Sequence, residues 1–541
     1  MLKKISLILF IIPIAFVIVT LVNFHSVSND SVQYSVLGYN LFHHGIFNTS
    51  YGVIPGWMQS PGWPLLLGLL SFILPGQILA PIAGFGITVL ILILFYYFIK
   101  QYSSALMAWL ATGILVLNPE FIILGRSGLS EPFYLLIHLI LFSLLYKAWF
   151  EGKAFSNRDI ILLAVLSLFL LFIRSEGILY IPVILYSILK RRFLFTNKNT
   201  KSSRTIFLAG IIYLFVLLIV LIPYGNWVKA KSGRFNIAPK ITFNARIGTV
   251  ARLLSQRHGL DFHNPDLMEE LSWYGLDKNT NELYSEHIFD DSYYNSLVTQ
   301  IHGKKKVWIK FFSLVLTNIE ETARMLIRSN PFPLFFVLLI FTGLFYLFKQ
   351  NKKLLIFIVI WIFPSVYFLI SHVQERFFYV MLPYLSFLAA YGVYSVALKI
   401  KRPYMLYNMV LLLLFLNASL YYNAYYQTLQ KNEVYYQVGQ DLKQTIPGEA
   451  KVCVKNFQPT FFSGNAFLKM PYCSVSDLHL YLQKNNTSYL LLGEEVDTFR
   501  KEFKPIFTRQ QTGGFQWIKT YSNPYQVFKL FKVIPSGAAS Q

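Results

Sequence analysis

The first 420 residues alternate long apolar runs with short polar segments. An α-helix needs roughly 20 apolar residues to cross the hydrocarbon core of a bilayer, and most of these runs approach that length with their flanks. The pattern therefore predicts a polytopic α-helical membrane protein with about eleven transmembrane helices. In order, the predicted spans are residues 5–24, 77–99, 105–117, 132–149, 160–173, 178–189, 207–223, 333–348, 354–370, 378–398 and 405–420.

Basic residues between the apolar runs indicate which side of the membrane each segment faces. Lys3 and Lys4 precede the first run, and residues 190–204, KRRFLFTNKNTKSSR, contain no acid. Because Lys and Arg are enriched in cytoplasmic loops, we predict a cytoplasmic amino terminus and an extracytoplasmic carboxyl terminus in the cell (inner) membrane. The first run is longer than a typical signal-peptide core and no small-residue cleavage site follows it, so we expect a retained helix.

Two long polar segments, residues 25–76 and 224–332, are expected to be outer loops of a transmembrane domain that covers residues 1–420. Residues 421–541 have a different pattern, in which helical stretches alternate with short strand-like runs such as AKVCVKN, SYLLLG and FQWIKTY. Strands that alternate with helices indicate an α/β arrangement. We therefore predict a small extracytoplasmic α/β domain after the last span.

Composition narrows the class of protein further. The chain has 541 residues, of which 55% are hydrophobic and 14% charged, and a formal net charge of +22. In a soluble chain this charge would suggest nucleic acid, but here the basic clusters flank apolar runs and set topology, so we expect a lipid bilayer and no nucleic acid as partner. The two cysteines, Cys453 and Cys473, either form a disulfide or remain thiols, and the sequence leaves both readings open.

Asp30 is the only acid in the segment from His25 to Pro64, which follows the first predicted span. A carboxylate at this depth lies level with lipid head groups, where a lipid-phosphate substrate would present its reactive carbon. Tyr34 and Leu37 follow at helical spacing, which places Asp30 at or next to a helix N-terminus, where the dipole keeps it ionised. Asp30 is a candidate catalytic base, and the alternative is a simple helix N-cap.

Glu131, in GRSGLSEP, is the second candidate acid on the same side of the membrane. It either has a chemical role or only begins a helix together with Ser130 and Pro132. Arg376 lies in a short outer turn and is a candidate phosphate ligand, because a guanidinium matches phosphate oxygens in a bidentate way. Weaker candidates for the same role are Arg126, Arg174, Arg246 and the run Lys304, Lys305 and Lys306.

Motifs for other chemistries are weak or absent. His258, Asp261 and His263 carry ligand-type side chains, but their spacing fits no single helix face. The sequence has no phosphate-cradling glycine loop, no GxSxG and no HExxH. Nucleotide-binding and common hydrolase functions therefore lose their usual support. No cofactor is predicted with certainty, and a divalent metal ion is left open.

An ordered set of segments resembles the membrane glycosyltransferases of the GT-C fold, with protein O-mannosyltransferases, aminoarabinose transferases of lipid A and bacterial family 39-like enzymes as the nearest relatives. The resemblance covers roughly residues 5–420, and Asp30 is followed by Tyr34 as in that family. It differs in having Asn29 where many relatives have a second acid, and Glu131 where Asp is frequent. The other matching stretches are PGWPLLLGLL, GRSGLSEPFYLL, FIRSEGILYIP and ERFFYVMLPYLSFLAAYG.

This resemblance implies inverting transfer of a sugar from a polyprenyl-phosphate donor to a lipid, glycan or protein acceptor on the outer face. Asp30 would remove the acceptor's proton, Glu131 would orient a substrate, and Arg376 with neighbouring cations would stabilise the departing phosphate. Two other functions remain open on the sequence, a lipid-linked glycan transporter or flippase and a polysaccharide polymerase or ligase.

Overall fold

The structure, a computed structural model, divides into two compact units. Unit 1 comprises Met1–Asn23, Ser60–Ile241 and Lys310–Tyr425, and unit 2 comprises Phe24–Gln59, Thr242–Ile309 and Tyr426–Gln541. The residues that the structure describes are 14–20, 25, 27–48, 56–74, 76–151, 155–195, 201–242, 246, 275–277, 281–283, 292, 315–316, 318–320, 322–324, 333–370, 375–400, 403–493, 496, 501–508, 511–512, 514–522, 524 and 526–534.

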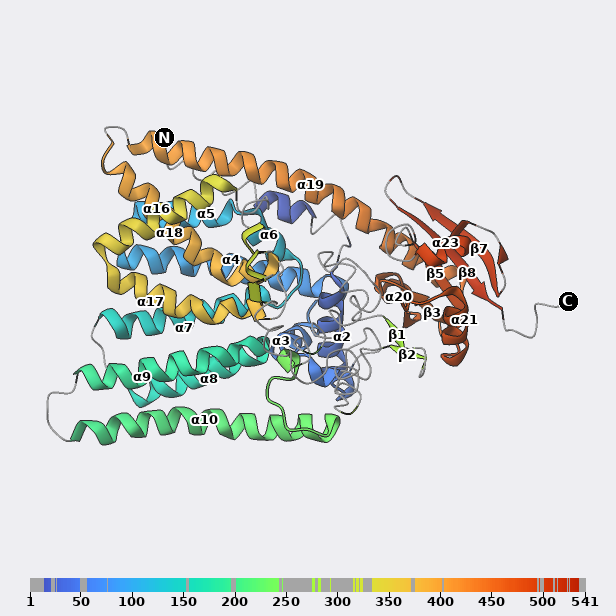
Figure 1. Cartoon of the computed structure of the whole chain (residues 1–541), viewed down its shortest axis with the longest axis horizontal. Coiled ribbons are helices and arrows are strands. Elements are labelled where there is room, and N and C mark those ends of the chain that lie inside the picture. Colours follow the sequence, from blue (N-terminus) through green and yellow to red (C-terminus); the bar gives the residue numbers. More distant parts are fainter. Residues whose placement is uncertain are drawn as a thin grey trace. The chain divides into compact units, whose positions relative to one another are not determined.

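Unit 1 is a bundle of apolar helices that run side by side (Figure 1). Its main helices are α3 (Gly62–Leu70), α4 (Gly76–Tyr102), α5 (Ala105–Val116), α6 (Pro119–Arg126), α7 (Glu131–Phe150), α8 (Asn157–Ile173), α9 (Ile181–Phe195), α10 (Lys201–Ser232), α16 (Leu334–Gln350), α17 (Lys352–Ile362), α18 (Leu382–Ala397) and the first part of α19 (Pro403–Thr445). Three 3₁₀ segments complete it, η2 (Ser175–Tyr180), η3 (Phe363–Ile370) and η4 (Glu375–Met381).

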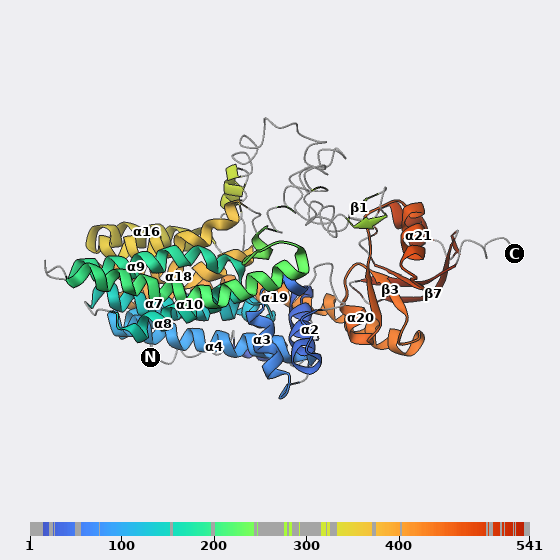
Figure 2. The same ribbon diagram turned by 90° about the horizontal axis from the view of Figure 1, so that it is seen from below.

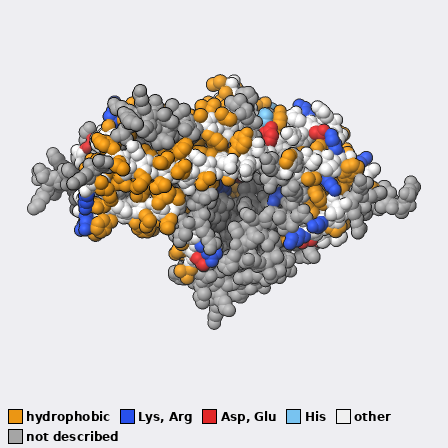
Figure 3. Space-filling model, turned by 90° about the horizontal axis from the view of Figure 1, so that it is seen from above, with side chains coloured by type: hydrophobic (Ala, Val, Ile, Leu, Met, Phe, Trp, Pro, Cys, Tyr) orange, Lys and Arg blue, Asp and Glu red, His pale blue; other side chains and the backbone are white. Residues whose placement is uncertain are grey.

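Five helices in the described part of the chain are long and apolar enough to cross a membrane, or six when the bent pair α5 and α6 is one span. The five are Leu79–Tyr102, Glu131–Phe150, Phe207–Ser232, Phe378–Ala397 and Pro403–Thr445. The chain is thus a membrane protein, and the count of about eleven spans stays a prediction. Many apolar side chains of α10 and of the first part of α19 are exposed, and Figure 3 shows hydrophobic side chains spread over the helical part. In a bilayer, these apolar side chains contact lipid tails instead of water.

Small residues let two of these helices approach closely. A Cβ added at Gly343 of α16 would meet the backbone carbonyl of Leu388 on α18, and one added at Gly392 would lie 2.6 Å from the carbonyl oxygen of Leu339. Close backbone approach at small residues is a common way for membrane helices to pack, because association there depends on van der Waals contact. The glycines at these two positions therefore determine how tightly α16 and α18 pack.

The sequence becomes polar where α5 ends, and the structure bends there by 65° into α6. Asn118 accepts a hydrogen bond from the Phe121 amide, and Pro119 occupies the first turn of α6. An Asn cap followed by Pro is a strong local signal for a new helix. The predicted span 105–117 corresponds to α5, and the stretch after it forms a second helix that is buried.

Unit 2 contains a mixed six-stranded sheet with the order β4-β3-β5-β8-β7-β6. Its strands are β3 (Lys451–Val454), β4 (Ala466–Lys469), β5 (Tyr489–Leu492), β6 (Gln511–Thr512), β7 (Phe515–Ser522) and β8 (Val527–Val533). Strand β3 runs parallel to β4 and β5, whereas the pairs β5–β8, β8–β7 and β7–β6 are antiparallel. A separate two-strand ladder joins β1 (Leu276–Asp277) and β2 (Glu282–Leu283).

Helices cover both faces of this sheet, and the strand pattern decides which core each side chain joins. In β3, Val452 and Val454 pack with Val434, Val438 and other apolar residues of α19, whereas Cys453 joins the opposite core with α21 (Val475–Lys484). This alternation has the period of two expected for a strand. The α/β pattern predicted for the carboxyl-terminal region is confirmed, although β4 was not anticipated.

Two further features of unit 2 bear on the sequence predictions. Helix α19 continues to Thr445, so it runs through residue 420, where the sequence pattern suggested a domain boundary. Cys453 is a buried thiol and Cys473 a half-buried thiol, which agrees with the thiol reading of this pair.

Helix α2 (Asn29–His44) belongs to unit 2 and packs on α20 (Gln458–Ser463), as Figures 1 and 2 both show. The helix that the spacing of Tyr34 and Leu37 predicted in this segment is present, and it belongs to the same unit as the carboxyl-terminal sheet. The separate 3₁₀ segment η1 (Gly56–Met58) approaches α2 closely, since a Cβ added at Gly56 would lie 3.0 Å from Leu37 Cδ2.

Candidate functional site

Five charged residues lie at helix ends of unit 1, in the first and last turns of α6, at the start of α7 and just after α8. In α6, Glu120 and Arg126 are 6% and 2% exposed, and Glu131, the first residue of α7, is 2% exposed. Arg174 and Glu176 follow α8 at the start of η2. Charged side chains are rarely buried in membrane helices unless they are paired or functional, so this polar layer is the candidate site of unit 1.

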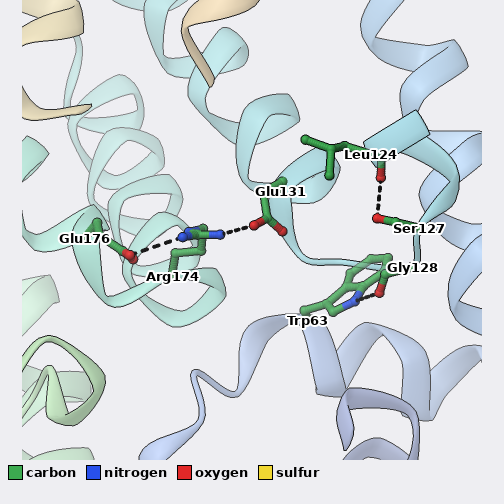
Figure 4. A network of polar contacts seen from close by, with 7 residues as sticks. All are labelled: Trp63, Leu124, Ser127, Gly128, Glu131, Arg174 and Glu176. Carbon is green, nitrogen blue, oxygen red and sulfur yellow. Dashed lines mark hydrogen bonds and ion pairs between the residues drawn. The ribbon is translucent and has the colours of Figure 1, made fainter. Parts of the chain in front are cut away.

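One guanidinium holds two carboxylates in this layer (Figure 4). Arg174 Nη1 donates to Glu131 Oε1 at 2.6 Å, and Nη2 donates to Glu176 Oε1 at 3.2 Å. The side chains of Glu131, Arg174 and Glu176 are only 3%, 16% and 11% exposed. Charge-assisted bonds of this kind orient a carboxylate strongly, because the surroundings offer little water to compete.

The turn that leads into Glu131 is held by a buried tryptophan. Trp63 is fully buried, and its Nε1 donates to the Gly128 carbonyl at 3.0 Å (Figure 4). Gly128 has a φ of +75°, which is unfavourable for residues with a side chain. At the end of α6, Ser127 Oγ donates a hydrogen bond to the Leu124 carbonyl at 2.7 Å. Trp63 was not predicted as a site residue, although its stretch PGWP is among those that resemble the GT-C enzymes.

Within the part of the chain that the structure describes, the buried Arg126 makes hydrogen bonds only to uncharged groups. Its Nη1 donates to the Tyr425 hydroxyl at 3.3 Å and its Nη2 to the Thr20 carbonyl at 3.4 Å, and its buried Nε has no acceptor. A buried cation is costly unless an anion compensates it. The geometry therefore leaves Arg126 with capacity to bind an anion such as a phosphate.

Glu120 and Tyr379 lie in the same layer as Arg126 and were not predicted from the sequence. Glu120 accepts a hydrogen bond from the Tyr421 hydroxyl at 3.0 Å. Tyr379 stacks on Phe121 with ring centroids 5.3 Å apart, and its segment η4 contacts α6 and α7. Arg376 lies in η4 too and is half-buried, so the structure brings the segment of this candidate phosphate ligand beside the helices of Arg126 and Glu131.

Asp30 and Tyr34 lie in unit 2, on the first two turns of α2. Ser28 is the N-cap, since its Oγ accepts the Ser31 amide at 3.1 Å. The reading of Asp30 as the N-cap is therefore wrong, while its expected place next to a helix N-terminus is confirmed. Tyr34 is 6% exposed. Arg246 is half-buried and belongs to unit 2.

The sequence position of Arg174 suggested a weak candidate phosphate ligand, and in the structure its guanidinium contacts two carboxylates. In the sequence, the contact of Arg174 with carboxylates is signalled only by the acid two residues later, Glu176 in RSEG. The possible metal ligands His258, Asp261 and His263, and the run Lys304 to Lys306, lie outside the described residues. Within the described ranges, no three His, Cys, Asp or Glu side chains converge as a metal site.

Comparisons with known proteins support one class of fold. Residues 325–473 match the sequence profile of the Alg9-like mannosyltransferase family. The oligosaccharyltransferase AglB from Archaeoglobus fulgidus, solved with an inhibitory peptide and a dolichol-phosphate, is similar with a TM-score of 0.53 at 12% identity, over 100% of this chain and 74% of that one. An Archaeoglobus fulgidus oligosaccharyltransferase solved with Zn and sulfate gives a TM-score of 0.55 at 12% identity, over 97% of this chain and 74% of that one.

ArnT from Cupriavidus metallidurans, solved with undecaprenyl phosphate, aligns over 99% of both chains with a TM-score of 0.43 and 11% identity. The comparison with curated protein sequences gave no match. The profile match and the archaeal structures confirm the resemblance to GT-C glycosyltransferases that the sequence motifs indicated. The chain is a membrane protein with a GT-C-like fold, several apolar helices and a small sheet region.

Proposed function

We propose that this protein transfers a sugar from a polyprenyl-phosphate donor to a lipid, glycan or protein acceptor on the outer face of the membrane. The observation that carries the proposal is Arg126, a buried guanidinium that, among the described residues, makes two long hydrogen bonds to uncharged groups and has no acceptor for its Nε. A phosphate supplies the missing negative charge and several acceptor oxygens. The dolichol-phosphate in the similar archaeal enzyme supports a ligand of this class.

The proposed reaction is a displacement at the anomeric carbon. The acceptor's oxygen or nitrogen forms a bond to this carbon and gives its proton to Asp30, while the bond from carbon to phosphate oxygen breaks. The lipid phosphate leaves with the electron pair, and the cations Arg126 and Arg376 stabilise its charge. Attack from the side opposite the phosphate inverts the anomeric centre.

The remaining predicted residues have supporting roles in this proposal. Glu131, oriented by Arg174, accepts hydrogen bonds from a sugar or acceptor hydroxyl. Tyr34 and Arg246 contribute to substrate binding. No nucleotide is required because the lipid carries the activated sugar, and this chemistry fits a sequence without a phosphate-cradling glycine loop.

The test uses purified protein incubated with a panel of radiolabelled polyprenyl-phosphate sugars and a membrane extract. The mass of the labelled product identifies the donor and the acceptor class together. Labelled lipid that crosses a vesicle membrane without transfer of its sugar would instead indicate a transporter. The absence of both would refute a function with these donors.

Two variants test the assigned roles against matched controls. Asp30→Asn is expected to abolish transfer, whereas Asp477→Asn, in the first turn of α21, should retain it. Arg126→Ala should weaken binding of polyprenyl phosphate, whereas Arg324→Ala, which removes an exposed ion pair with Glu320, should not. Full turnover by Asp30→Asn would overturn the base assignment, and unchanged lipid binding by Arg126→Ala would overturn the phosphate assignment.

A further inference from the structure

The chain that enters α2 is attached to the carboxyl-terminal part of unit 2 at three positions, immediately before Asp30. The attached residues are His25, Val27 and Asn29. Their partners come from three separate elements, α19, the turn after β3 and the start of α20. No local sequence pattern connects residues 25–29 with residues 433–458, because more than 400 residues separate them along the chain.

Glu433 of α19 holds His25 with both carboxylate oxygens. Its Oε2 accepts the backbone N–H of His25 at 2.9 Å, and its Oε1 lies 3.1 Å from His25 Nδ1. The imidazole ring stacks on Tyr436, one turn further along α19, with ring centroids 3.7 Å apart and planes at 7°. This contact fixes both the backbone and the side chain of His25, and Glu433 is mostly shielded, with 20% of its side chain exposed.

The other two attachments lie closer to Asp30. Gln458 Nε2 donates to the Val27 carbonyl at 3.2 Å. Asn29 Nδ2 donates to Asn456 Oδ1 at 3.5 Å, and Asn456 Nδ2 in turn donates to the Tyr435 hydroxyl at 2.9 Å. Because Ser28 caps the helix between these two points, the first turn of α2 is held on each side of its cap.

We propose that Glu433, Asn456 and Gln458 are positioning residues for Asp30, so that the carboxyl-terminal domain holds the helix that carries the base. This inference rests on the proposed function for its catalytic consequence. A general base must lie within hydrogen-bond reach of its proton, and a displacement of about 1 Å can lower a rate by about 100-fold. Loss of these contacts changes the direction of α2 without removing any group that touches substrate.

Two substitutions of Glu433 are compared, one that removes its contacts with His25 and one that keeps them. Glu433→Ala removes both bonds to His25, whereas Glu433→Gln keeps an acceptor for the His25 amide and offers an N–H to Nδ1. Glu433→Ala should lower kcat by up to about 100-fold and leave the donor KM unchanged. Glu433→Gln should stay close to the wild-type protein. Glu449→Ala, at an exposed turn, is the matched control and should change neither constant.

Hydrogen exchange of the amides in the first two turns of α2 gives a readout that needs no activity. Exchange should be faster in Glu433→Ala and normal in Glu433→Gln. The inference is overturned if exchange in Glu433→Ala is unchanged, or if exchange is faster while kcat stays the same. It is also overturned if Glu433→Ala and Glu433→Gln lose kcat equally. A wild-type protein that transfers no sugar refutes the proposed function instead, and exchange then still decides whether Glu433 holds α2.

Discussion

Replacing Arg174 with Met tests whether the buried charges at the start of α7 and η2 form one interdependent unit. The substitution leaves Glu131 and Glu176, 3% and 11% exposed, without the cation that both contact. Removing one partner of a buried ion pair typically costs about 3–5 kcal/mol, because an uncompensated charge remains in a poorly hydrated place. Arg174 is itself only 16% exposed, so solvent screening reduces this value little.

The measurement is denaturant unfolding of the purified protein in detergent micelles, repeated for a small set of variants. Arg174→Met alone should lower the free energy of unfolding by about 3–5 kcal/mol. Adding Glu131→Gln and Glu176→Gln removes both carboxylate charges, so the triple variant should recover much of the loss. Arg324→Met, which breaks an exposed ion pair with Glu320, should cost less than about 1 kcal/mol.

The reasoning is refuted if Arg174→Met costs no more than Arg324→Met. It is refuted as well if the triple variant is as unstable as Arg174→Met alone. In that case the loss would come from packing of the Arg174 side chain, not from the unpaired carboxylates.

Three further predictions concern the fold. Trp63→Phe keeps most of the buried ring but leaves the Gly128 carbonyl without its donor, so it should destabilise the protein by about 1–3 kcal/mol in the same unfolding assay, and no loss would contradict the assigned bond. Gly343→Ala forces α16 and α18 apart at the Leu388 carbonyl and should cost about 1–3 kcal/mol; a stable variant would show that the helices can separate freely. A reporter fused after Gln541 should be active only outside the cytoplasm, and cytoplasmic activity would overturn the predicted topology.

Local sequence patterns predicted much of the helical unit. The apolar runs at residues 132–149 and 207–223 correspond to α7 and to part of α10. Such signals work because a helix in lipid satisfies its own backbone hydrogen bonds within one segment. The helical spacing after Asp30 predicted α2 as well, but not its packing on α20, since burial against other elements cannot be seen in a local pattern.

The candidate residues were predicted less completely than the helices. Arg126 was one of the weaker candidates, whereas Asp30 and Glu131 stood out because a charge near an apolar run is conspicuous. The partners that orient such charges did not, because Arg174 is 43 residues from Glu131 and Tyr425 is 299 residues from Arg126. Contacts at such separations depend on how whole helices pack, and a single sequence carries no local trace of them.

By itself, the sequence determined the membrane class, the positions of most helices and the α/β character of the carboxyl-terminal region, because hydrophobic period and length act locally. Only the tertiary structure decided that Arg174 bridges two carboxylates, that Arg126 is buried beside neutral groups, and that α2 is joined to the carboxyl-terminal domain. The physical reason is the same in each case. The energy of a buried charge or hydrogen bond is set by the groups that surround it in space, and the chain brings those groups together only when it folds.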